Sequence, residues 1–311
     1  MLEKTLREVD ILYYRSLNGV LKEKYGCKVY KLSLSSGLSC PNRDGRCGKD
    51  GCIFCSPFGS GEFSENPNLS IKEQIALAKE RVSKKIRNGK YIAYFQSLSN
   101  TYGDVEYLRK IFHEAIEPPE IVELSVATRP DCLPKEVLEL LSELNKIKPV
   151  TVELGLQTVH KTSADYIRRG YDLEVYETAV ENLKEIGVSV VTHMIIGLPN
   201  ETEEMIIETA RYIGKHSDGV KFHLLHIIND TDLETEYKNG RVKTLELSEY
   251  VRILAKCVEV LPSTAVIHRL TGDGDKKTLA APLYSANKKY VLNTINKYFT
   301  EHNITEGKNF I

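Results

Sequence analysis

A regular alternation of short apolar segments with longer amphipathic segments limits the possible folds more than any other feature of this sequence. Strands are expected at 29–34, 91–96, 121–126, 150–155, 188–196 and 219–227. Helices are expected at 70–88, 105–116, 134–145, 161–186 and 202–216. Strands that alternate with helices form a parallel sheet with right-handed crossovers. The pattern therefore predicts an α/β fold, and a partial barrel, a full barrel and a doubly wound sheet all stay open at this point.

The two ends of the chain have a different character. Residues 1–26 repeat apolar side chains near helical spacing, and the final third predicts a helix at 247–261, a strand at 265–270 and a helix at 283–302. No linker composition separates these parts. We predict an N-terminal helical extension at 1–28, a core at 29–230 and a C-terminal α/β elaboration at 231–311 that packs on the core.

Composition and charge exclude several classes of protein. The 311 residues are 41% hydrophobic and 27% charged, as in ordinary globular proteins, and the formal net charge is -1. Such a balance gives no general attraction to nucleic acid, although local basic groups occur at Lys84, Lys85, Arg87 and Lys90 and at Lys288 and Lys289. The sequence contains no secretory signal and no apolar run of about 20 residues. We expect a cytoplasmic protein without a membrane partner.

Four of the seven cysteines lie in one glycine-rich loop that follows the first predicted strand, at Cys40, Cys47, Cys52 and Cys55. Three interpretations compete. All four thiolates can close around one structural zinc ion. Two of them can form a disulfide, which a reducing compartment disfavours. Alternatively, Cys40, Cys52 and Cys55 can hold a cubane 4Fe–4S cluster and leave one iron open. Spacing alone does not separate zinc from the cluster.

Polar residues follow the other strands at the same edge of the predicted sheet. They are Gln96, Ser97, Asn100 and Thr101 after the second strand, Thr128, Arg129 and Asp131 after the third, and Gln157 and Thr158 after the fourth, with His193 on the fifth strand and His223 and His226 on the sixth. Ligands bind at the carboxyl ends of strands in parallel α/β folds. A structural zinc knuckle does not require such a gathering, so the pattern favours a catalytic cluster.

Several ordered motifs of this sequence resemble one family. They are Cys40-Pro41-Asn42-Arg43-Asp44-Gly45, Tyr94-Phe95-Gln96, Asn100-Thr101-Tyr102, Thr128-Arg129-Pro130-Asp131-Cys132-Leu133, Leu154-Gly155-Leu156-Gln157-Thr158, Arg168-Arg169-Gly170, His193 and Gly197-Leu198-Pro199. Together they resemble the radical S-adenosylmethionine superfamily, and within it the bacterial elongator-subunit-like group. The usual superfamily signature is C-x3-C-x2-C, and the first gap here is longer.

The resemblance implies a partial (β/α)6 TIM-type barrel and two cofactors, a 4Fe–4S cluster on Cys40, Cys52 and Cys55 and S-adenosylmethionine on its open iron. Cys47 is expected to be an extra cysteine of this sequence. By position, the residues expected to contact S-adenosylmethionine are Phe54, Gln96, Asn100, Thr128, Gln157, Arg169 and His193. Arg169 is expected to bind the carboxylate of the methionine moiety, because a guanidinium can bind a carboxylate through two hydrogen bonds.

Two further histidines are candidates for substrate binding or acid–base catalysis. His223 and His226 are three residues apart on the last predicted strand. Because side chains on a strand alternate between its faces, at most one of the two is expected to point into the site.

The elongator-like relatives implied by the resemblance act on the wobble uridine of tRNA. We therefore expect a tRNA-modifying radical enzyme that acts on an aminomethyl-type side chain and receives electrons from a flavodoxin- or ferredoxin-type reductant. Two alternatives are a radical enzyme that acts on a small metabolite and a zinc-stabilised tRNA-binding protein without catalysis. The sequence does not specify the oligomeric state.

Overall fold

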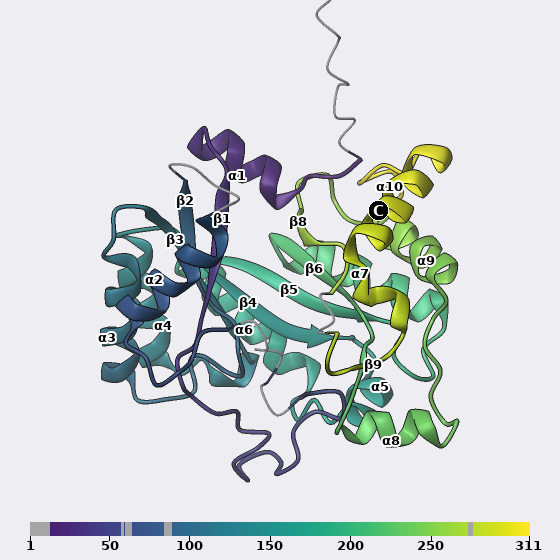
Figure 1. Cartoon of the computed structure of the whole chain (residues 1–311), viewed down its shortest axis with the longest axis horizontal. Coiled ribbons are helices and arrows are strands. Elements are labelled where there is room, and N and C mark those ends of the chain that lie inside the picture. The colour runs from purple at the N-terminus through teal and green to yellow at the C-terminus, as the bar shows by residue number, and fades with distance from the viewer. Residues whose placement is uncertain (1–12, 57–58, 60–63, 84–88, 273–275) are drawn as a thin grey trace, which may run out of the picture.

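Seven strands form one curved parallel sheet in the order β1-β2-β3-β4-β5-β6-β8 (Figure 1). The structure is a computed structural model, which describes residues 13–56, 59, 64–83, 89–272 and 276–311. The strands of the sheet are β1 (Val29–Leu34), β2 (Lys90–Phe95), β3 (Ile121–Thr128), β4 (Val150–Gln157), β5 (Ser189–Ile196), β6 (Gly219–Leu224) and β8 (Val266–Arg269). The short strands β7 (Ile227–Ile228) and β9 (Leu279–Ala281) form a separate antiparallel ribbon.

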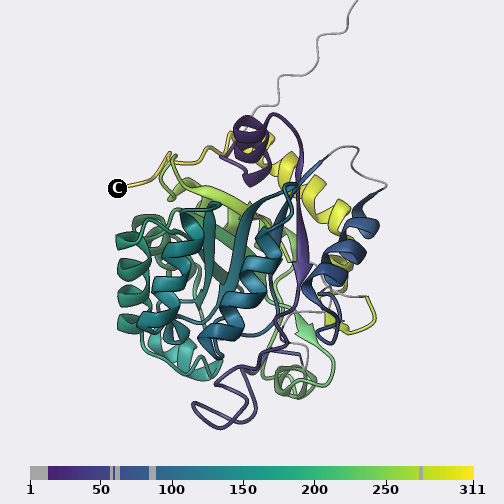
Figure 2. The ribbon, with the colours of Figure 1, turned by 90° about the vertical axis from the view of Figure 1, so that its left-hand side faces the viewer.

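Helices cover the outer face of the curved sheet (Figures 1 and 2). They are α2 (Ile71–Val82), α3 (Val105–Ile116), α4 (Lys135–Asn145), α6 (Leu173–Glu185), α7 (Glu203–His216) and α9 (Leu247–Glu259), while the short helix α5 (Lys161–Tyr166) lies near α8 at the carboxyl ends of the strands (Figure 1). The remaining helical elements are α1 (Leu17–Tyr25), α8 (Asp232–Lys238), α10 (Lys288–His302) and the 3₁₀ turns η2 (Pro130–Cys132) and η3 (Leu283–Ala286). The predicted α/β architecture of a partial TIM-type barrel is confirmed. No described helix has the length and apolar character needed to cross a bilayer.

The strands divide their side chains between a core and an interior. Outward residues such as Leu32, Phe95 and Leu154 are fully buried, and they belong to one apolar cluster with Leu108 and Phe112 of α3. The alternate, inward positions carry polar residues: Lys31, Tyr94, Ser125, Glu153, His193 and Lys221. This division follows from the two-residue period of a strand. The outer face stabilises the fold, and the inner face is available for chemistry.

Helix α1 lies at the amino ends of the strands, at the opposite end of the sheet from the cysteine loop (Figure 1). Lys24 Nζ and Tyr25 Oη both donate to Glu123 Oε1 over 2.8 Å, which joins α1 to β3. The prediction of one helix over 1–26 is wrong at 13–16, where Ser16 forms a bridge with Ile267 of β8 and caps α1 through its side chain. Residues 1–12 lie outside the described residues.

Strand β8 extends the sheet beyond the six strands counted from the sequence. A strand at 265–270 is expected, and the structure places it parallel to β6, where Lys221 is the register partner of Arg269. Strand β7 and helix α8 interrupt the alternation of strands and helices between β6 and β8. Because of this interruption, the sequence pattern does not predict that α9 and β8 form a further helix–strand unit of the parallel sheet.

Candidate active site

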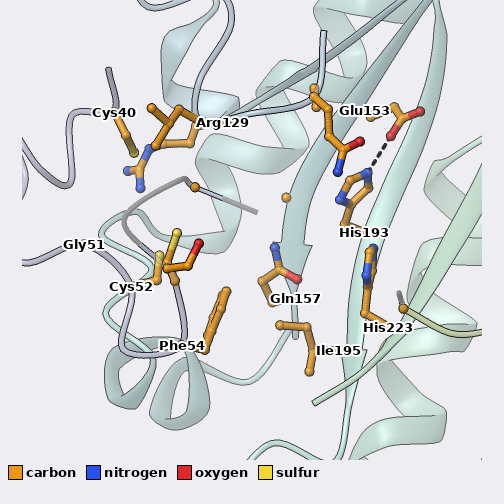
Figure 3. A pocket seen from close by; sticks show the side chains of 18 of the residues that line it. Cys40, Gly51, Cys52, Phe54, Arg129, Glu153, Gln157, His193, Ile195 and His223 are labelled. Atoms are coloured by element: carbon orange, nitrogen blue, oxygen red, sulfur yellow. Dashed lines mark hydrogen bonds and ion pairs between the residues drawn. The ribbon is translucent and has the colours of Figure 1, made fainter. Parts of the chain in front are cut away.

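The loop after β1 brings three cysteines to a cavity at the carboxyl ends of the strands. Cys40, Cys52 and Cys55 are half-buried free thiols, and all three line a cavity of about 380 Å³. A volume of this size is in the range of small-ligand pockets. In Figure 3, Cys40, Cys52 and Phe54 lie on one side of the cavity, and Glu153, His193 and His223 lie on the other. The cavity therefore separates a sulfur-bearing wall from a polar barrel wall.

Polar contacts hold the cysteine loop, and Ile53 adds apolar packing in a cluster with Ile167 and Leu233. Asn42 Nδ2 donates to Arg168 O over 2.5 Å and to Cys52 Sγ over 3.4 Å. Arg43 Nη2 donates to Cys55 O over 3.0 Å. The main chain of the loop turns tightly where Cys55 N donates to Cys52 O over 2.9 Å. These contacts set the direction of the thiols before any metal binds, which is the purpose of outer-shell contacts at a metal site.

The fourth cysteine of the loop faces away from this cavity. Cys47 is exposed, is not among the residues that line the cavity, and donates through Sγ to Asp131 Oδ2 over 3.8 Å. Within the described ranges, no three His, Cys, Asp or Glu side chains are gathered closely enough to hold a single ion. A cubane cluster carries its thiolates on separate irons, so its ligands are spaced more widely than those of one zinc ion. Cys40, Cys52 and Cys55 line one cavity, and their role as ligands of such a cluster stays a prediction.

Gly170 allows the cysteine loop to approach the segment between α5 and α6. Its φ is +79°, and a Cβ added there would lie 2.9 Å from Asn42 Oδ1 and 3.5 Å from Arg129 Nη2. We expect Gly170→Ala to lower the free energy of unfolding by about 1–3 kcal/mol, because of the strained φ and the displaced Asn42. Urea unfolding measures this loss. The control Gly240→Ala shares a positive φ of +73° but has nothing within 4 Å, so it isolates the backbone contribution.

The far wall of the cavity is organised around Glu153, a fully buried carboxylate in the middle of β4. It accepts hydrogen bonds from the side chains of five strands: Lys31 of β1, Tyr94 of β2 (2.9 Å), Ser125 of β3 (2.9 Å), His193 of β5 (2.8 Å) and Lys221 of β6 (2.6 Å). The dashed line in Figure 3 marks the contact to His193. A buried charge is tolerated when it is paired and hydrogen-bonded, as Glu153 is.

This arrangement shifts the pKa values of its members in a consistent direction. Burial alone would raise the pKa of Glu153, but Lys221, Lys31 and His193 together lower it well below its usual value. Burial and the charge of Lys221 lower the pKa of His193 to about 4. Burial also lowers the pKa of Lys221 to about 7, although Glu153 opposes this shift. Near neutral pH, Glu153 is therefore ionised, His193 is neutral and Lys221 is the group that exchanges a proton most easily.

Most residues expected to contact S-adenosylmethionine line the same cavity. These are Phe54, Gln96, Thr128, Gln157, Arg169 and His193. Gln157 ends β4 with a φ of +69°, where the register with β5 shifts, and its side chain lies between the two walls in Figure 3. Backbone strain of this kind concentrates at functional sites. The structure brings these six residues together, and their contacts with the cofactor stay a prediction.

Two of the predicted contact residues are already engaged by the protein. Arg169 is 4% exposed, and it donates from Nε to Tyr171 O and from Nη1 to Leu156 O and Thr158 O. Nε and Nη1 of Arg169 are thus used by main-chain carbonyls. Only Nη2 is left for a carboxylate, so the expected pair of parallel hydrogen bonds cannot form without breaking these contacts. Asn100 is fully buried, accepts from Ser36 Oγ and donates to Ala127 O, and it is not among the residues that line the cavity.

His223 and His226 both line the cavity, so the expectation that at most one points into the site is wrong. Strand β6 ends at Leu224, and His226 lies in the segment between β6 and β7. The alternation of a strand therefore does not apply to the pair. Nε2 of His223 is buried without a hydrogen-bond partner among the described residues, and the His223 ring lies 5.1 Å from the His193 ring.

Sequence reasoning missed Glu153 and Lys221. Each is a charged residue inside an otherwise apolar strand, in Val150-Thr151-Val152-Glu153-Leu154 and Gly219-Val220-Lys221-Phe222. A charge is rarely buried without a partner, so a charge in the middle of a buried parallel strand is the signal that would have found both.

Comparison with known families decides the classification. Residues 42–213 match the family described as the radical SAM superfamily, and residues 217–301 match the radical SAM C-terminal domain. The chain belongs to the radical SAM superfamily. The chain is therefore a radical SAM enzyme, and the cofactors of this superfamily are a 4Fe–4S cluster and S-adenosylmethionine. The expected zinc-stabilised, non-catalytic alternative is therefore wrong, and the reaction itself is not specified by the family.

Individual relatives of this radical SAM enzyme include elongator-like proteins. It is 41% identical to the uncharacterized protein YtqA of Bacillus subtilis, over 96% of this chain and 92% of YtqA. It is 27% identical to the tRNA uridine(34) acetyltransferase of Methanocaldococcus jannaschii, over 59% of this chain and 34% of that protein. Its fold resembles Elp3 of Methanocaldococcus infernus, with a TM-score of 0.69, 18% identity, and coverage of 89% of this chain and 64% of that one.

Proposed function

We propose that this radical SAM enzyme modifies the wobble uridine of tRNA at an aminomethyl-type side chain. The observation that carries the proposal is that the cysteine loop and the polar wall around Glu153 face one cavity, so a radical source and a substrate group can meet there. The similarity to a tRNA uridine(34) acetyltransferase supports tRNA as the substrate class. A base that is flipped out of the anticodon stack would enter from the carboxyl ends of the strands, since α1 lies at the amino ends (Figure 1).

Different residues of the cavity hold the cluster and S-adenosylmethionine. Cys40, Cys52 and Cys55 hold the cluster. When bound, these two cofactors would supply one-electron reductive cleavage of a carbon–sulfur bond of the sulfonium group. S-adenosylmethionine is positioned by Phe54, Gln96, Thr128, Gln157, Arg169 and His193. Asn100 supports the loop after β2 through its hydrogen bonds with Ser36 and Ala127. His193 donates through Nε2 to Glu153, so its Nδ1 is an acceptor for a ligand.

Acid–base steps belong to the opposite wall. Lys221 Nζ donates to Glu153 Oε2 and to Tyr94 Oη over 2.8 Å, and it lines the cavity. We assign it the movement of protons to and from the substrate, with His223 and His226 as further candidates for substrate contact. A flavodoxin- or ferredoxin-type protein in the cytoplasm would deliver the electron. Free cysteines throughout the described residues suit a reducing compartment.

The decisive experiment compares the nucleosides of total tRNA from a deletion strain and its parent by mass spectrometry. We expect one C5-substituted uridine of the wobble position to disappear and its precursor to accumulate. With purified enzyme under reducing conditions, we expect tRNA from the deletion strain to increase 5′-deoxyadenosine release, and tRNA from the parent to have little effect because it is already modified.

The controls separate the substrate class from the radical chemistry. Cys52→Ala should abolish 5′-deoxyadenosine release with every tRNA, and restoring the gene should restore the nucleoside. Unchanged tRNA nucleosides together with tRNA-independent 5′-deoxyadenosine release would overturn the tRNA proposal and favour a small-molecule substrate.

A further inference from the structure

Arg129 follows β3 and carries a positive charge to the sulfur-bearing wall of the cavity. It lines the cavity together with Cys40 and Cys52, and in Figure 3 its guanidinium extends toward the space between these two cysteines. The guanidinium therefore places a positive charge on the wall of the cavity that carries these two thiols. Its side chain is only 10% exposed, so water screens this charge weakly.

Four contacts fix the position of this charge. Arg129 donates from Nε to Asp131 Oδ1 over 2.9 Å and from Nη2 to Asp131 Oδ2 over 2.8 Å, and from Nη1 to Arg169 O over 2.8 Å. Its guanidinium also lies 5.0 Å from the centre of the Tyr171 ring. A bidentate ion pair combined with a cation–π contact restricts an arginine strongly. All three groups that hold Arg129 belong to the protein, so its charge does not depend on a ligand.

The counter-charge of Arg129 lies on the side away from the cavity. Asp131 is not among the residues that line the cavity, and its two carboxylate oxygens also accept from Cys47 Sγ and Cys132 Sγ, each over 3.8 Å. The ion pair is therefore oriented, with its positive end toward the cluster ligands and its negative end toward Cys47 and Cys132. An oriented pair of charges produces a field at the cluster site even though its net charge is zero.

We propose that the positive charge of Arg129 raises the reduction potential of the cluster and so favours the electron-transfer step. Asp131 moderates this effect. Adding an electron to a cluster is easier beside a fixed positive charge, and cluster potentials respond to nearby charge and to hydrogen bonds at sulfur. Asn42 acts in the same direction, since it donates to Cys52 Sγ. The inference concerns the cofactor side of the enzyme and holds for any substrate.

The test measures the midpoint potential of the reconstituted cluster by anaerobic titration monitored by electron paramagnetic resonance. Arg129→Met should lower the ratio of reduced to oxidised cluster at a fixed potential about tenfold, which corresponds to a shift of about 59 mV to more negative values for one electron. Asp131→Asn should shift the potential in the opposite direction, and Arg129→Lys should keep most of the wild-type value. Iron and sulfide contents must equal those of the wild type.

Opposite signs distinguish an electrostatic role from a structural one, because distortion of the loop would shift both variants in the same direction. Arg109→Met is the matched control, since Arg109 forms an ion pair with Glu143 on the outer helices and should leave the potential unchanged. If Arg129→Met fails to hold the cluster, Asp131→Asn and Arg129→Lys decide. A potential of Asp131→Asn that equals the wild-type value or is more negative, or an Arg129→Lys potential about 59 mV below the wild-type value, would overturn the proposal.

Discussion

Replacing Glu153 by glutamine is expected to lower the free energy of unfolding by about 3–5 kcal/mol, because it leaves Lys31 and Lys221 inside the barrel without their carboxylate. Urea unfolding of the two chains measures the difference. In Glu153→Gln/Lys221→Met, one of the two unpaired charges is also removed, and part of the loss should be recovered. A loss below about 1 kcal/mol in the single variant would show that the interior charges do not depend on Glu153.

Glu203 provides a matched control. It also pairs with two cations, Arg252 and Lys256, but on the outside of the protein. Glu203→Gln should cost no more than about 1 kcal/mol, because exposed ion pairs contribute little. Both carboxylates pair with two cations, so a difference between the two losses in free energy of unfolding reports on burial and not on the number of ion pairs.

The loss in Glu153→Gln is also expected to depend on pH. Without the carboxylate that raises it, the pKa of Lys221 falls further below its value in the unfolded chain. The unfolded state then binds more protons than the folded state, so stability rises with pH. The wild type also gains stability as pH rises, but only as its Lys221 loses its proton near pH 7. The deficit should therefore shrink between about pH 6 and pH 8 and stay constant above it. A deficit that grows between about pH 6 and pH 8 would contradict the assignment.

Cys40→Ala is expected to abolish binding of the cluster, whereas Cys47→Ala is expected to keep it. Cys40 lines the cavity with Cys52 and Cys55, and Cys47 faces Asp131 outside it. A cubane with only two thiolates from the protein would not be retained. Iron and sulfide per chain and the visible absorbance after anaerobic reconstitution measure the difference. Loss of iron in Cys47→Ala would overturn this choice of ligands, and circular dichroism of both variants checks that they are folded.

The strand–helix pattern predicted most elements because each carries its own periodicity. The helix expected at 105–116 matches α3, and the strand expected at 29–34 matches β1. The helix expected at 161–186 is instead two helices, α5 and α6. The chain turns between them with φ values of +57° at Arg168 and +79° at Gly170, and this turn receives the cysteine loop through Asn42. Because the helical apolar pattern continues on both sides of this turn, the sequence pattern does not reveal it.

The site was predictable only where local motifs identify it. The cysteine loop and the residues after each strand are local features, and the structure brings most of them to one cavity. The contacts of Glu153 depend on the register of five strands and on the tilt of the sheet, which no local pattern contains. The engagement of Arg169 with main-chain carbonyls is likewise a consequence of how two loops meet.

Strand β8 has a practical consequence for anyone who wishes to shorten this protein. It covers the edge of β6 and supplies Arg269 to the cavity, although it lies about 40 residues later in the chain. A fragment that stops after β6 would present unpaired N–H and C=O groups along that edge, which are a template for self-association. Truncation would thus create an aggregating species rather than a minimal catalyst.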